Sequence, residues 1–191
     1  YGDHRDLHSF PTRRFPILGS SGETDNSSTT GGVYLYQKDS NNRVSQVTKI
    51  TPSDSSVGDE FGTSVAIWDN YIIVGATKED SKGIEAGAAY LFKINSNNSV
   101  SQLSKITASD TNSYDLFGSS VSIDNSYIVI GAKHKEKAGI NNVGAAYLFK
   151  IQGNDKVSEL SKLTALDIEL NDYFGHSIAI NGDYIVVGAN R

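Results

Sequence analysis

The sequence predicts an all-β fold assembled from a tandem repeat of about 56 residues. The phrase Asp-x-Phe-Gly occurs three times, and each phenylalanine is followed fourteen residues later by a Gly-Ala pair. A Tyr-Leu-Tyr/Phe triplet and an Ile/Leu-Thr pair recur in the same phase. Several landmarks in register at one period indicate a repeat protein. The motif residues, to which we assign a structural role, are Phe61, Gly62, Gly75, Phe117, Gly118, Gly131, Phe174, Gly175 and Gly188.

The first two strands of a repeat are clearest after Phe117. Residues 117–123 place valine and isoleucine between serines, which is the period of a strand with one buried face. Residues 124–126 read Asp-Asn-Ser and predict a turn, because Asn and Asp tolerate a left-handed backbone. Residues 127–130 are mostly β-branched, which favours a strand buried on both faces. Gly131 then ends this strand at a point where another backbone is expected to come close.

Two further strands complete the repeat. A polar loop at 133–142 leads to a third strand at 144–149, and residues 153–155 read Gly-Asn-Asp, a tight turn. The fourth strand, 157–163, is the most polar of the four. Its lysine suits the outer edge of a sheet, where lysine discourages unwanted strand pairing.

Four short antiparallel strands per repeat are typical of a β-propeller blade, whereas tandem sandwich domains need about 100 residues each. We therefore expect β-propeller blades across 18–191, covering about three blade-equivalents. Complete blades are predicted at 61–110 and 117–167, with half blades at 18–54 and 174–191. Because a ring needs about four to eight blades, further blades of the same chain are expected.

The first residues do not fit the repeat. Residues 1–14 resemble the translation of a short-read sequencing adapter, and one lost base later in the adapter would also give residues 15–17. We interpret 1–17 as a non-native, adapter-derived leader and exclude it from functional reasoning. The chain also stops in the middle of a repeat, so we expect it to be an internal fragment of a larger protein.

Composition excludes several classes of function. The chain carries a net charge of −5 and lacks the basic patch of a nucleic-acid-binding protein. It contains no apolar run of the length that a membrane span needs. It has no cysteine, which excludes a disulfide framework and thiol chemistry.

Paired aspartates are the candidate metal ligands. They stand five residues apart before each Phe-Gly, where two carboxylates and loop carbonyls could clamp calcium. The alternative is turn capping, in which each carboxylate accepts backbone N–H bonds and fixes the approach to Phe-Gly. Calcium is the cofactor that the first interpretation implies, and no other cofactor is expected. The pairs are Asp54 with Asp59, Asp110 with Asp115, and Asp167 with Asp172.

The motifs Asp-x-Phe-Gly-x-Ser, Tyr-Ile-Ile/Val-Val/Ile-Gly-Ala and Gly-Ala-Ala-Tyr-Leu-Phe together resemble the FG-GAP repeat family. The resemblance covers 18–191 and is nearest to the bacterial type of repeat. It implies blades similar to those of the integrin α-subunit propeller, in a secreted or cell-surface protein. Integrin blades often carry a calcium loop, Asp-x-Asp-x-Asp-Gly, between their first two strands. The corresponding turns here, including 124–126, are too short and too poor in carboxylates to supply six or more oxygens.

The function implied by the resemblance is adhesion or ligand binding, through loops at one end of the ring, with a protein or glycan partner. We expect no catalysis, because the recurrent Asp and Ser residues are explained by the repeat and no histidine recurs with them. His134, in a lysine-rich loop, is expected to be solvated. One alternative is an accessory propeller that positions a secreted hydrolase encoded elsewhere in the same gene. Another is a purely structural array, whose loops at 77–86 and 133–143 could be changed freely.

Overall fold

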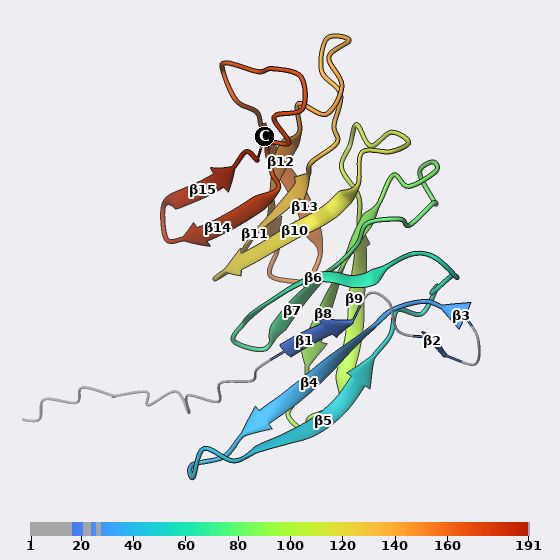
Figure 1. Ribbon diagram of the computed structural model, residues 1–191. Coiled ribbons are helices and arrows are strands. Elements are labelled where there is room, and N and C mark those ends of the chain that lie inside the picture. The colour runs from blue at the N-terminus through green and yellow to red at the C-terminus, as the bar shows by residue number, and fades with distance from the viewer. Residues whose placement is uncertain (1–16, 21–23, 26–27, 191) are drawn as a thin grey trace, which may run out of the picture.

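The computed structural model describes residues 17–20, 24–25 and 28–190, and it is built from β-strands and connecting loops (Figure 1). The predicted leader therefore lies outside the described residues, apart from Ile17. No helix in the described part of the chain has the length and apolarity to span a membrane. The strands are β1 (Ile17–Ser20), β2 (Thr24–Asp25), β3 (Ser28–Thr29), β4 (Gly32–Lys38), β5 (Val44–Ile50), β6 (Phe61–Trp68), β7 (Tyr71–Ala76), β8 (Ala88–Ile94), β9 (Val100–Ile106), β10 (Phe117–Asp124), β11 (Tyr127–Ala132), β12 (Ala145–Ile151), β13 (Val157–Leu163), β14 (Ser177–Asn181) and β15 (Tyr184–Gly188).

Two four-stranded antiparallel sheets form the centre of the molecule, in the orders β6-β7-β8-β9 and β10-β11-β12-β13. A three-stranded sheet, β1-β4-β5, precedes them and a two-stranded sheet, β14-β15, follows them. The predicted fold class, all-β with blade-like four-stranded sheets, is confirmed. The polar fourth strands, β9 and β13, lie at the outer edges of their sheets, as their lysines indicated.

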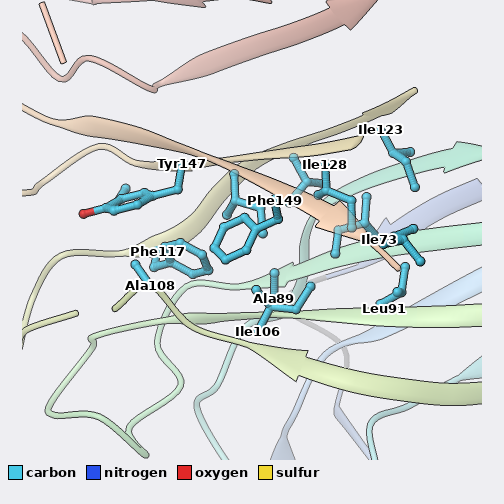
Figure 2. Packing of buried hydrophobic residues seen from close by; sticks show 14 of the residues in the cluster. Ile73, Ala89, Leu91, Ile106, Ala108, Phe117, Ile123, Ile128, Tyr147 and Phe149 are labelled. Carbon is cyan, nitrogen blue, oxygen red and sulfur yellow. The ribbon is translucent and has the colours of Figure 1, made fainter. Parts of the chain in front are cut away.

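Stacking of consecutive sheets creates the core. On β7, Ile72 and Val74 face the preceding sheet and join one apolar cluster, whereas Ile73 faces the following sheet and joins the other. This alternation explains why the strand is apolar at successive positions. Figure 2 shows the second cluster, in which Phe117 lies beside Tyr147 and Phe149 of β12. The ring centroids of Phe117 and these two residues are 5.6 and 6.1 Å apart, edge to face, a favourable arrangement for aromatic rings.

The Gly-Ala and Phe-Gly motifs meet where neighbouring sheets touch. A Cβ on Gly75 would collide with the carbonyl oxygen of Gly118 in the next sheet, and a Cβ on Gly131 would collide with that of Gly175. Serine hydroxyls strengthen the same contact, because Ser64 Oγ donates to Gly118 O at 2.7 Å. The equivalent Ser120 hydroxyl donates to Gly175 O at 2.6 Å. The glycines are therefore required by close backbone approach, as predicted for Gly131.

Each sheet is also joined to its neighbour through the loops. We call the segments that precede β6, β10 and Phe174 the lead-in loops (51–60, 107–116 and 164–173). The Phe117 amide donates to Ala86 O at 2.9 Å, and the Phe174 amide donates to Val143 O at 2.9 Å. Phe61 takes part in the corresponding bridge to the first sheet, and Gly62 packs against that sheet. The lead-in loops and the loops after β7 and β11 project from one end of the molecule (Figure 1).

The last sheet leaves an apolar face open. Val186 is 67% exposed, whereas Ile73, at the equivalent position of β7, is fully buried by the next sheet. Gly188, the counterpart of Gly75, would bring a Cβ only against Ser177 of its own sheet. This face thus has the form that accepts a neighbouring sheet elsewhere in the chain.

Candidate functional site

The second aspartate of each pair caps its lead-in loop. Asp59, Asp115 and Asp172 are all buried. In each case, Oδ2 accepts the backbone N–H of the residue three positions earlier, a short-range bond that fixes the turn. Burial raises the pKa of Asp59, although the Ser56 amide opposes this effect. The three bonds are Ser56 N to Asp59 at 2.8 Å, Asn112 N to Asp115 at 2.7 Å and Glu169 N to Asp172 at 2.5 Å.

In the lead-in loop of each complete blade, the first aspartate of the pair ties that loop to the last two strands of the blade. Asp110 accepts hydrogen bonds from Tyr147 Oη at 2.7 Å and Lys162 Nζ at 2.6 Å. Burial alone would raise the pKa of Asp110, but these two donors and the charge of Lys135 together outweigh it and hold the pKa below its usual value. Asp54 is bound in the same way by Lys105, at 2.9 Å. Asp167, in the third lead-in loop, is exposed.

The position between the paired carboxylates differs in charge between the two blades. In the second complete blade it is Lys135, which is buried and lies 2.8 Å from Asp115 Oδ2 and 3.7 Å from Asp110 Oδ2. In the first complete blade it is Glu79, whose Oε1 is 2.6 Å from Lys105 Nζ. Ammonium groups therefore neutralise Asp110 and Asp115 in the second complete blade, and Asp54 and Glu79 in the first. No cluster of three or more His, Asp or Glu side chains suited to a metal ion occurs in the described ranges.

The calcium clamp stays a prediction. The ion pairs of the paired aspartates define which group calcium would have to displace. In the second complete blade, calcium between Asp110 and Asp115 would have to displace the ammonium of Lys135. Hydrogen bonds from Asn112, Lys135 and Lys162 already account for both carboxylates as loop anchors. The arrangement is thus well suited to holding a loop in one conformation.

A polar cavity of about 480 Å³ opens at the loop end of the second complete blade. One wall is the lead-in loop, through residues 112–115, and the other is the loop after β11, through His134, Glu136, Asn141 and Asn142. We call this space the loop cavity. Its volume lies within the range of about 300–1,000 Å³ that is usual for small-molecule sites.

His134 is more enclosed than the sequence indicated. Its ring lies 5.5 Å from that of Tyr173 in the next lead-in loop, and it is half-buried rather than solvated. Burial lowers the pKa of His134 below its usual value, and the charge of Lys133 lowers it further. The imidazole is therefore neutral at pH 7 and can both donate and accept a hydrogen bond.

The first complete blade has different residues at the equivalent place. There Lys78 replaces His134, and its ammonium lies 2.9 Å from Glu60 and 3.9 Å from Glu85. Gly58 stands where the other blade has Tyr114. A comparison of the aligned copies shows only that both positions vary, with Gly58, Tyr114 and Asn171 at one and Lys78 and His134 at the other. Their proximity in space could not be read from one copy alone.

Comparison with known proteins finds one family match in each repeat of the chain. Residues 44–92, 100–149 and 157–191 match the FG-GAP repeat. No curated protein matches the sequence. Among solved structures, the chain is similar to Sqt1 from Chaetomium thermophilum, with 12% sequence identity and a TM-score of 0.46. That similarity covers 83% of this chain but 34% of Sqt1, so this chain spans about a third of its length. Because the FG-GAP match extends over most of the sequence, the chain belongs to the FG-GAP repeat family.

Proposed function

We propose that this chain is part of a non-catalytic, secreted or cell-surface β-propeller scaffold that binds a protein or glycan ligand for adhesion. The observation that carries the proposal is the loop cavity, which lies at the end where the blade loops gather. Binding residues commonly lie on loops that a rigid scaffold positions. Here the sheets are nearly identical between blades, whereas the loops differ.

Rigid support of the loops favours binding over a purely structural role. Buried contacts such as the one between Lys135 and Asp115 hold the cavity walls in place. A site whose walls are ordered before the ligand arrives loses less conformational entropy on binding.

Further blades of the same chain are the partners that the open face of β14 and β15 would accept. Val186 and Gly188 on that face are equivalent to Ile73 and Gly75, which pack against the following sheet. A larger ring would present several loop ends side by side. Multivalent attachment of that kind strengthens adhesion without any new contact.

Exchange of one loop tests the proposal. We would couple the chain to fluorescent beads and count attachment to surfaces coated with extracellular proteins or glycans. In the variant, residues 133–143 are replaced by 77–86, which connect the equivalent strands. Lys135 is kept in the graft at the position of Glu79, because its ammonium neutralises the buried Asp115 at 2.8 Å. Reduced attachment with unchanged thermal stability is expected, and equal attachment would instead favour a structural array.

The alternative function is an accessory propeller that positions a secreted hydrolase. It predicts a catalytic domain in the same gene and attachment that does not depend on the 133–143 loop. Sequencing of the complete gene, combined with the bead measurement, separates the two functions.

A further inference from the structure

The groups that the loop cavity offers to a ligand define its chemistry. Tyr114 is 55% exposed at the rim, and its ring is an apolar face with a polar hydroxyl at one end. Glu136 and Asn141 also line the cavity. Within the described part of the chain, the side chains of these three residues are not engaged in hydrogen bonds or ion pairs. The cavity therefore presents a phenol, a carboxylate and an amide to whatever enters it.

The Glu136 carboxylate disfavours an anionic ligand that comes into direct contact with it. Asp115 is neutralised by Lys135 at 2.8 Å, and His134 is neutral at pH 7 because its pKa is lowered. Glu136 is exposed and, among the described residues, forms no ion pair with the lysines of its loop, because Lys135 is paired with Asp115 and Lys137 donates to Thr164. An anion at this place would be repelled, whereas a neutral molecule with many hydroxyl groups could donate to the carboxylate and exchange hydrogen bonds with the amides.

We propose that the loop cavity binds a neutral oligosaccharide, with one sugar ring lying against Tyr114 and its hydroxyls bonded to Glu136, Asn141 and His134. This inference rests on the proposed binding function and names its ligand class. The equivalent region of the first complete blade lacks the site, because Gly58 offers no ring. There the ammonium of Lys78 is paired with Glu60 at 2.9 Å.

One substitution removes the ring and leaves the backbone undisturbed. Tyr114 has a φ of 68°, and the equivalent Gly58 has a φ of 92°. Glycine adopts this left-handed conformation without strain. Tyr114→Gly should therefore preserve the loop and leave the melting temperature equal or higher. The control is Val57→Ala, which trims an exposed side chain on the equivalent loop of the other blade.

Calorimetric titration with four probes gives the test. The probes are neutral tetrasaccharides of glucose, mannose and N-acetylglucosamine, with trigalacturonate as the anionic comparison. At least one neutral probe should bind wild type and Val57→Ala alike, and should bind Tyr114→Gly about tenfold more weakly or worse. Glu136→Gln should relax the discrimination against trigalacturonate.

Two results would overturn the inference: no neutral probe binding more tightly than about 10 mM, or equal affinity for wild type and Tyr114→Gly. The bead measurement keeps this failure separate from that of the proposed function. Loop-dependent attachment without sugar binding would retain adhesion with a protein ligand. Sugar binding without attachment would refute adhesion and retain the site.

Discussion

Gly75→Ala tests how the sheets are held together. Gly75 Cα lies against the backbone of Gly118 in the next sheet, and an added Cβ would come within 3.0 Å of both Gly118 O and Ser64 Oγ, a separation that real Cβ atoms essentially never show. The carbonyl is backbone, so it cannot rotate away. Either the two sheets separate, or the Ser64 hydroxyl leaves the carbonyl to which it donates at 2.7 Å.

The expected cost follows from these two contacts. Forcing an extra methyl group into a packed interface costs about 1–3 kcal/mol, and loss of the Ser64 hydrogen bond costs about 1 kcal/mol more. We therefore expect Gly75→Ala to lower the free energy of unfolding by about 2–4 kcal/mol. Gly153→Ala is the matched control, because a Cβ there meets no atom within 4 Å. Alanine at such a position should stabilise the chain by about 0.4–1 kcal/mol.

Urea unfolding followed by tryptophan fluorescence and circular dichroism measures both variants. The urea concentration at the midpoint should fall for Gly75→Ala and rise slightly for Gly153→Ala. The slope of unfolding free energy against urea concentration should stay unchanged in both variants. A loss below about 0.5 kcal/mol for Gly75→Ala, within the range of ordinary surface substitutions, would refute the reasoning. It would mean that the sheets are not in close backbone contact at this point.

Three further predictions concern the contacts between loops and sheets. Ser120→Ala removes the hydroxyl that donates to Gly175 O and should cost about 1 kcal/mol in urea unfolding; no change would contradict the bond. Lys135→Ala leaves the buried Asp115 carboxylate without its ammonium partner and should cost about 3 kcal/mol, a loss that Asp115→Asn in the same chain should partly relieve. Burial raises the pKa of Asp110, but its lysine and tyrosine donors leave it below the ordinary 3.8. Its stabilisation is therefore complete above about pH 4 and is lost as pH falls through the lower folded value. Asp110→Asn should flatten this part of the curve of melting temperature against pH, and an unchanged curve would exclude the mechanism.

The fold could be predicted because each landmark repeats for a physical reason. The apolar run of β11 is continuous because sheets cover both of its faces. Gly75 and Gly131 recur because each meets the backbone of the next sheet. The lysine at the outer edge was also predicted, but its bond to Asp110 was not. That bond joins residues 52 positions apart, and their separation in the sequence indicates no contact.

The loop cavity was beyond sequence reasoning for a related reason. It depends on residues that differ between copies, such as Tyr114 in place of Gly58, and a repeat pattern draws attention to what is shared. His134 was expected to be solvated because its sequence neighbours are lysines. In the structure it packs against Tyr173, which belongs to the next lead-in loop. Only the stacking of successive blades brings these two rings together.

Bead attachment tests the central claim most directly, since the claim is that the loop end of this FG-GAP module binds a ligand. The quantity to measure is the ratio of attached beads carrying wild type to beads carrying the chimera with 77–86 in place of 133–143. Both proteins must first show the same melting temperature. The account predicts a clear excess of attached wild-type beads on at least one protein or glycan surface, abolished by free soluble chain. A ratio near one on every surface would contradict it and would leave these blades as a structural array.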